Sequence, residues 1–222
     1  KYFLLLLATI LLTGVHGQNR QVDLPKNIPL QDILKKAKKQ KKHVLLDFGS
    51  PRCSPCLFIK NKIFTIDSIA DFINERFVSV DYTEGPEKKR LSKIYEVYTE
   101  PVLLICDANG RVMHRMEGKC TAGEMMARLR QGLDVKNNLT AQKLMYDNGN
   151  RSSEFLINYL ETLHIAGLRT QRDSVLQNIF SPSFHVDSLK TPKYWNVFLR
   201  YNESPVSREG SYVFKHREEF YK

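Results

Sequence analysis

The stretch Val-Leu-Leu-Asp-Phe-Gly-Ser-Pro-Arg-Cys-Ser-Pro-Cys, residues 44–56, decides the fold of this chain. Its first half belongs to a short, nearly continuous apolar run over residues 43–48, which is typical of a buried central strand. Two cysteines, Cys53 and Cys56, come directly afterwards, and residues 57–64 favour a helix. Such a pair can be a working dithiol, half of a metal site, or an inert disulfide.

A Cys-x-x-Cys pair between a strand and a helix favours redox chemistry. At a helix start, unpaired N–H groups and the positive end of the helix dipole favour the thiolate of Cys53 and make it nucleophilic. Cys56, one turn later, can attack the mixed disulfide that Cys53 forms, and Pro55 suits a first helical turn. A zinc site is not predicted, because Cys106, Cys120 and the six histidines lack ligand spacing. A structural disulfide without catalysis stays an alternative.

Helix and strand patterns alternate as far as residue 133. The turn Asn109-Gly110 between two apolar runs predicts a hairpin at the end of this region. Strands alternating with helices indicate an α/β fold, a mixed sheet flanked by helices on both faces. We expect helices over 29–41, 57–64, 66–74, 87–95 and 121–133, and strands over 43–48, 77–81, 101–106 and 111–116.

The strand pattern disappears from residue 134 onward, which predicts an all-α helical extension over 134–222. Because its last helix reaches the end of the chain without a stop signal, a truncated helical repeat is one interpretation. Its many aromatic residues favour a core, and the alternative is a platform that docks a partner protein. We expect helices over 140–147, 153–166, 170–179, 187–200 and 207–221.

The first 17 residues are typical of a secretory signal peptide. A basic residue, an apolar run of about ten residues and a small-residue exit ending at Gly17 follow one another. The apolar run is shorter than the roughly 20 residues that span a bilayer, although an uncleaved N-terminal anchor stays an alternative. We therefore expect export to the periplasm or the extracellular space, cleavage near Gly17, and no stable membrane insertion afterwards.

The net charge of +10 is concentrated in a lysine-rich run over residues 35–42. Leu30, Ile33, Leu34 and Ala37 recur at helical spacing, so the lysines form the solvated face of an amphipathic helix. No aromatic side chains interleave with these lysines to stack bases. The sequence therefore predicts no nucleic-acid partner.

Residues 44–56 resemble the active-site region of thioredoxins, in which an Asp-Phe pair ends the central strand ahead of the dithiol. The resemblance continues at Val80-Asp81 and at residues 98–104, where the family has a cis-proline opening a hairpin. It covers roughly residues 29–133, and it implies a thioredoxin-like domain over 26–133. With the signal segment and the helical extension, the chain is similar to exported thioredoxin-like proteins of Bacteroidetes-type bacteria.

The resemblance also implies roles for individual residues. Asp47 would be the buried carboxylate that helps to deprotonate Cys56; the alternative is a strand-end residue that is only hydrogen-bonded to backbone. Pro101 would be cis and face the dithiol, leaving nearby backbone free to pair with an extended substrate; the alternative is a plain strand-initiating proline. No cofactor is implied beyond the Cys53–Cys56 disulfide.

The chain departs from the family at four of these positions, one of which is Ser54 in place of the family's Gly. Arg52 replaces the family's Trp, and Glu100 precedes the proline where a small or aliphatic residue is usual. Both are expected in the substrate groove, with opposite effects on the Cys53 thiolate. Phe77 aligns with the strand position where thioredoxins place a lysine near the buried Asp.

The sequence thus predicts an exported thiol–disulfide oxidoreductase that acts on protein disulfides through Cys53 and Cys56. Its partners would be protein thiols and disulfides and a further redox protein. The alternative is a non-catalytic interaction protein with a structural disulfide and a partner-binding helical tail. Cys106 is expected to be an inert core thiol, and Cys120 a partly exposed one.

Overall fold

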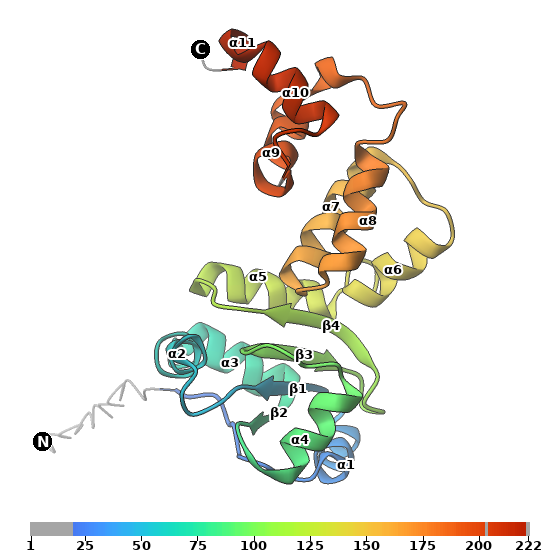
Figure 1. Ribbon diagram of the computed structural model, residues 1–222. Coiled ribbons are helices and arrows are strands. Elements are labelled where there is room, and N and C mark those ends of the chain that lie inside the picture. Colours follow the sequence, from blue (N-terminus) through green and yellow to red (C-terminus); the bar gives the residue numbers. More distant parts are fainter. Residues whose placement is uncertain (1–19, 203, 221–222) are drawn as a thin grey trace, which may run out of the picture.

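The computed structural model describes residues 20–202 and 204–220. The expected signal segment, residues 1–17, therefore lies outside the described residues. The described part consists of a sheet domain, residues 20–133, and a helical extension, residues 134–220, that stands above one edge of the sheet (Figure 1). Within the described part, the helices are all too short or too polar to cross a membrane.

The sheet has four strands in the order β2-β1-β3-β4. β1 pairs with β2 in parallel and with β3 in antiparallel orientation, and β3 and β4 form the predicted hairpin. The mixed sheet expected from the sequence is confirmed. The strands are β1 His43–Phe48, β2 Phe77–Tyr82, β3 Val102–Cys106 and β4 Val112–Glu117.

Helices cover both faces of the sheet, because alternate strand residues point to opposite faces and both sets are apolar. α1 and α4 pack with the face that carries Val44 and Leu46. α3, α5 and the π-helical turn η1 pack with the face that carries Leu45. The helices are α1 Leu30–Gln40, α2 Ser54–Phe58, η1 Ile59–Ile63, α3 Asp67–Arg76, α4 Gly85–Ile94 and α5 Ala122–Leu133.

An extended segment, residues 20–28, lies along the outer edge of β2, which the sequence did not predict. The N–H of Asp81 donates to the carbonyl of Pro25 at 2.9 Å, and the N–H of Asn27 donates to the carbonyl of Asp81 at 2.8 Å. These bonds occupy backbone groups that an edge strand would otherwise expose.

The helical extension differs from the expected helices at two places. The helix expected over 187–200 is divided at Pro192, because a proline lacks the N–H of a helix interior and fits only a first turn. The helix expected over 207–221 is interrupted at His216, whose ψ of 22° departs from helical geometry. The elements are α6 Leu139–Asp147, α7 Ser153–Ile165, α8 Arg169–Ile179, η2 Val186–Lys190, α9 Pro192–Tyr201, α10 Arg208–Lys215 and α11 Arg217–Phe220.

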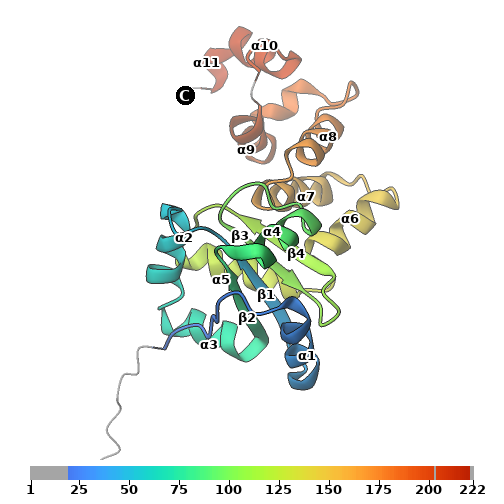
Figure 2. The same cartoon turned by 60° about the horizontal axis from the view of Figure 1, so that its bottom comes forward.

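The extension docks on β4, the other edge strand of the sheet (Figure 2). The N–H of Leu139, at the start of α6, donates to Nδ1 of the buried His114 at 3.1 Å. Nε of the buried Arg115 donates to the carbonyl of Ala166 at 2.9 Å. Ile165 also packs against the core of the sheet domain. The extension therefore covers an edge that would otherwise be open to pairing.

Candidate redox site

The two predicted cysteines lie together at the N-terminus of α2. Cys53 is the N-cap of this helix, and its Sγ accepts a hydrogen bond from the N–H of Cys56 at 3.2 Å. Pro55 occupies the first turn, as expected. The two sulfur atoms are joined in a disulfide, with the Cα atoms 5.2 Å apart. Cys56 is 2% exposed and Cys53 is only half-buried, so an incoming sulfur would meet Cys53 first.

Gly49, which ends the central strand segment, is packed against this disulfide. A Cβ atom at Gly49 would lie 3.0 Å from Sγ of Cys56 and 3.2 Å from its Cβ. Glycine at this position therefore lets the strand end approach the dithiol helix closely.

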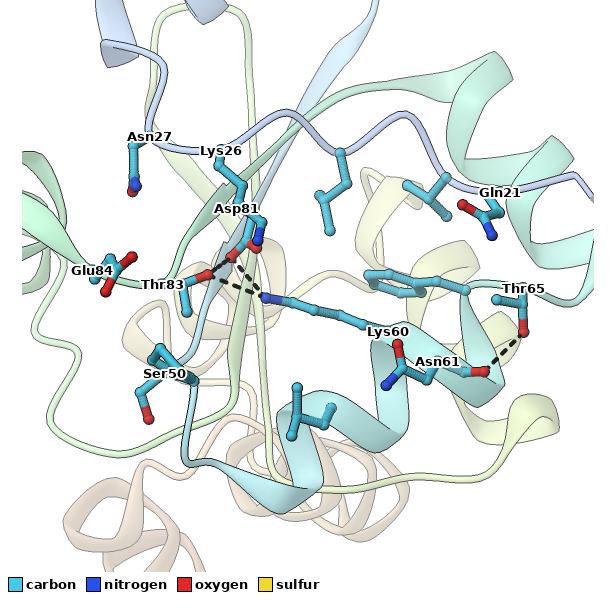
Figure 3. Close-up of a pocket in the computed structure, with 15 residues that line it drawn as sticks. Gln21, Lys26, Asn27, Ser50, Lys60, Asn61, Thr65, Asp81, Thr83 and Glu84 are labelled. Carbon is cyan, nitrogen blue, oxygen red and sulfur yellow. Dashed lines mark hydrogen bonds and ion pairs between the residues drawn. The ribbon is translucent and has the colours of Figure 1, made fainter.

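Beneath the dithiol helix, two carboxylates lie side by side on neighbouring strands. Asp47 of β1 and Asp81 of β2 are register partners, so their side chains share the face that η1 covers. Lys60 of η1 reaches both: Nζ lies 2.7 Å from Asp81 Oδ1 and 3.4 Å from Asp47 Oδ2. Thr83 also donates its hydroxyl to Asp81 (Figure 3). The Lys60 ammonium is thus shared by two carboxylates that are each only 2% exposed.

The environment of Asp47 raises its pKa to about 6. Burial is the main cause, since it disfavours the charged carboxylate; the Lys60 ammonium opposes this shift and the Asp81 carboxylate adds to it. The 3.4 Å separation from Lys60 is long for a hydrogen bond, and Asp47 Oδ2 has no hydrogen-bond partner among the described residues. Asp47 can therefore take up and release a proton near neutral pH.

Lys60 is the site residue that the sequence analysis missed. Phe77, which aligns with the family's lysine position, is an apolar core residue at 3% exposure. The cation comes instead from the helical segment that follows the dithiol. Lys60 is four residues after Cys56, a spacing that places two side chains on the same helix face, and this was the available signal.

A cavity of about 480 Å³ opens beside the dithiol helix. Lys60, Asp81, Thr83 and Ser50 line it (Figure 3). Leu57, the residue after Cys56, lines it as well. The N-terminal segment 20–28 contributes the opposite wall. The Lys60 side chain, 19% exposed, thus connects the buried carboxylates to an opening at the surface.

The structure brings Glu100 to the dithiol and gives Pro101 the expected cis bond. The Glu100–Pro101 peptide is cis, and the N–H of Gly118 on the neighbouring strand end donates to the carbonyl of Pro101 at 3.0 Å. A carboxylate oxygen of Glu100 and the two sulfur atoms of the Cys53–Cys56 pair all lie within 4.8 Å of one another.

Glu100 is an anion held beside the disulfide. Partial burial raises the pKa of Glu100. Hydrogen bonds from Lys88 and Ser50 lower this pKa by more, so the net shift is downward. Nζ of Lys88 lies 2.5 Å from Glu100 Oε1. Glu100 therefore opposes a thiolate at Cys53, as expected, while Lys88 offsets its charge. Arg52, by contrast, is exposed to solvent.

The other two cysteines are buried free thiols. Cys106 is fully buried, and burial raises the pKa of its thiol to about 12, in agreement with an inert core residue. The expectation that Cys120 is partly exposed is wrong. Its side chain packs among Leu129 and other apolar residues of the core between the sheet and α5, it is 6% exposed, and burial raises its pKa.

The family comparison agrees with this geometry. Residues 30–133 match the family model described as a thioredoxin-like domain. The chain contains a thioredoxin-like domain. Its boundaries run from the first residue of α1 to the last residue of α5, and the helical extension lies outside the match.

Three solved structures are similar to this chain. A proposed disulphide-isomerase from Bacteroides thetaiotaomicron is 26% identical, with a TM-score of 0.49 over 53% of this chain and 98% of that one. A thioredoxin from Thermus thermophilus is 21% identical, with a TM-score of 0.45 over 53% and 92%. The C-terminal domain of DsbD from Neisseria meningitidis is 20% identical, with a TM-score of 0.41 over 46% and 90%. No curated protein matches the chain.

The thioredoxin-like domain thus carries a dithiol with access from one side and a proton-exchanging carboxyl beneath it. The dithiol can pass between two thiols and a disulfide, because both electrons reside on the two sulfur atoms. Cys53, Cys56 and Glu100 are also the described residues whose ligand atoms come close enough to share a metal ion.

Proposed function

We propose that this protein is an exported thiol–disulfide oxidoreductase that acts on protein disulfides. The observation that carries the proposal is the Cys53–Cys56 pair at the N-terminus of α2, with Sγ of Cys53 capping the helix. A structural disulfide would not need this position, where backbone N–H groups stabilise a thiolate.

The first step, in the direction of reduction, is attack by the Cys53 thiolate on one sulfur of a substrate disulfide. The new Cys53–substrate bond forms while the substrate S–S bond breaks, and the departing thiolate takes a proton. Cys53 is the attacking residue because it is the more exposed sulfur of the pair.

In the second step, Cys56 resolves the mixed disulfide. Its thiolate attacks Sγ of Cys53, the substrate leaves as a second thiol, and the Cys53–Cys56 disulfide forms. The substrate gains two electrons and the dithiol loses two. Asp47 supports this step as the acceptor of the Cys56 proton, because a pKa of about 6 matches proton exchange near neutral pH.

The substrate groove follows the backbone beside Pro101. By the family resemblance, the backbone beside Pro101 would pair with an extended substrate segment next to Cys53. Glu100 and Arg52 flank this groove and contribute to the choice of substrate. A second redox protein would restore the starting state of the dithiol, in either direction of the reaction.

Trapping of mixed disulfides tests the enzyme function. Cys56→Ser should accumulate disulfide-linked complexes with substrate proteins in cell extracts. Dithiothreitol should reduce these mixed disulfides and release the trapped proteins. Cys120→Ser is the matched control, since it removes a buried thiol outside the site, and it should trap nothing. If Cys56→Ser traps nothing and the wild type shows no dithiothreitol-dependent reduction of a protein disulfide, a non-catalytic interaction protein is the better interpretation.

Export rests on the pattern of residues 1–17, which is typical of a secretory signal peptide. The mass of the protein recovered from the host cell checks it. Cleavage near Gly17 should give a chain that starts close to Gln18, and an intact N-terminus in the cytosolic fraction would contradict export.

A further inference from the structure

We propose that the reduced dithiol and Glu100 together form a binding site for a zinc ion. In the oxidised protein, Sγ of Cys53, Sγ of Cys56 and a carboxylate oxygen of Glu100 already lie within 4.8 Å of one another. Zinc binding itself needs only the reduced cysteines, whereas its effect on the dithiol rests on the proposed function.

The distances fit a tetrahedral zinc ion. With Zn–S bonds of about 2.3 Å and Zn–O bonds of about 2.0–2.2 Å, neighbouring ligand atoms lie roughly 3.5–3.8 Å apart. Reduction releases the two sulfur atoms from their mutual bond, so they can separate by side-chain rotation. The Glu100 oxygen then has to approach by no more than about 1.3 Å to complete three of the four positions.

The ligand atoms are prepared electrostatically. Cys53 lies at the N-terminus of α2, where the thiolate form required for metal binding is favoured. The Glu100 carboxylate already lies beside the two sulfur atoms, and it pairs with the Lys88 ammonium at 2.5 Å. Two thiolates, one carboxylate and Zn²⁺ carry a net charge of −1, which the Lys88 ammonium offsets.

Glu100 is also held in place by groups that do not contact the metal. Lys88 of α4 and Ser50 fix its carboxylate from outside the ligand set, and Lys88 is itself anchored to the carbonyl of Thr83 at 3.2 Å. Such outer contacts orient metal ligands in protein sites. The Glu100 carboxylate, directly ahead of Pro101, thus lies on the side of the dithiol.

Zinc is the metal that this ligand set favours. Two thiolates exclude the hard cations Mg²⁺ and Ca²⁺, which take oxygen ligands, whereas Zn²⁺ binds sulfur and carboxylate together. Cys56 is buried, while the Glu100 side chain is 28% exposed, so the ion enters from the side of Glu100 and Cys53. The fourth position faces solvent and takes a water molecule.

Zinc and the disulfide exclude each other. Binding converts two thiols into zinc thiolates and releases two protons, without transfer of electrons, whereas the disulfide leaves no thiolate to bind. Zinc therefore stabilises the reduced state. It also prevents the Cys53 thiolate from attacking a substrate disulfide. This makes the site a metal-dependent control on the dithiol.

Competition with a chromophoric zinc chelator tests the site on the full chain. We expect one Zn²⁺ per reduced protein and none per oxidised protein. Glu100→Gln keeps the shape of the side chain but removes the anionic ligand, and it should weaken binding at least about 10-fold, since even outer-shell changes cost 10- to 100-fold. Glu96→Gln, an exposed glutamate of the same loop, is the matched control and should bind like the wild type.

Cobalt gives a second readout that does not depend on activity. Co²⁺ added to the reduced wild type should show sulfur-to-cobalt charge-transfer absorption and tetrahedral visible bands, and Glu100→Asp should weaken binding because its carboxylate is one methylene shorter. Absence of binding to the reduced wild type, or equal zinc affinity of the wild type and Glu100→Gln, would overturn the proposal. Disulfide reduction assayed with a metal chelator present reports separately on the enzyme function.

Discussion

At Asp47, burial and the Lys60 ammonium act on one carboxyl in opposite directions. Burial prevails, and the pKa of Asp47 is about 6. Lys60 keeps it from rising further, although the same ammonium lies closer to Asp81. The pKa of the carboxyl beneath the dithiol is therefore set mainly by burial and is moderated by a side chain on η1.

Removal of the Lys60 charge should raise the pKa of Asp47 above 6. Lys60→Met keeps most of the aliphatic stem but removes the charge that favours the carboxylate. An NMR titration of the Asp47 carboxyl carbon measures the change directly. Lys62→Met, which removes an exposed lysine two residues away, is the control and should leave the titration midpoint unchanged. A midpoint in Lys60→Met equal to that of the wild type would contradict the role of Lys60.

The connection between β1 and α2 packs directly against the Cys53–Cys56 pair, so its packing depends on whether the pair is oxidised or reduced. Gly49 begins this connection, directly after β1, and its backbone lies against the Cys56 side chain. In the disulfide, Cys56 cannot rotate away from an added methyl group. In the reduced protein it can, so the two redox states respond differently to the same substitution.

Gly49→Ala should therefore destabilise the oxidised protein more than the reduced one. Overpacking of this kind costs about 1–3 kcal/mol, and the difference between the two states should make the Cys53–Cys56 pair easier to reduce. Equilibration with glutathione buffers measures the potential. Gly123→Ala is the control, because nothing lies within 4 Å of its added Cβ. A potential unchanged in Gly49→Ala would show that the strand end relaxes around the methyl group.

Elements with strong periodicity could be predicted from the sequence, and contacts between elements could not. The strand over residues 43–48 agrees with β1 because its apolar run is bounded by charged and turn residues. Lys60 was missed because its partners, Asp47 and Asp81, belong to two strands whose register is set only by the folded sheet. The burial of Cys120 likewise depends on α5 packing, and the division at Pro192 was readable from proline chemistry alone.

At the scale of the whole molecule, the helical extension is held to the sheet through β4. Arg115 is the central contact: besides Ala166, it donates to the carbonyl of Tyr95 at 3.2 Å and lies 3.6 Å from Glu117. It thus joins the extension, the loop ahead of Glu100 and the edge strand in one buried group.

Arg115→Met should loosen the extension from the thioredoxin-like domain. The loss of charge-assisted hydrogen bonds, each worth about 1.5–3 kcal/mol, leaves the Ala166 and Tyr95 carbonyls without this donor. Hydrogen exchange should then speed up in α6 and α7 more than in β1. Arg111→Met is the control: its side chain is 80% exposed, and its pair with Asp107 contributes little. Equal exchange in Arg115→Met and the wild type would show that apolar packing alone holds the extension.

Two buried groups in different parts of the molecule make opposite contributions to its pH stability. The pKa of Asp47 lies above its ordinary value of 3.8, so its contribution is full below pH 3.8 and is lost as the pH rises to about 6. Nδ1 of His114 accepts a hydrogen bond from the N–H of Leu139, and burial lowers the pKa of His114 from 6.5 to about 4. Its contribution is full above pH 6.5 and is lost as the pH falls to about 4.

Asp47→Asn should separate these contributions. At pH 7 the variant should be more stable than the wild type by about 3 kcal/mol, because it no longer buries an ionised carboxyl. The advantage should shrink as the pH falls below 6 and vanish near pH 4, where Asp47 of the wild type is protonated. In the wild type, the stability gained as Asp47 takes up a proton offsets the stability lost at His114 as the pH falls. The variant lacks this gain, so its stability should fall more steeply between pH 6.5 and 4. Urea unfolding at several pH values measures both effects. Since His114 and the other titrating groups are common to both proteins, a constant difference between the two curves would contradict the raised pKa of Asp47.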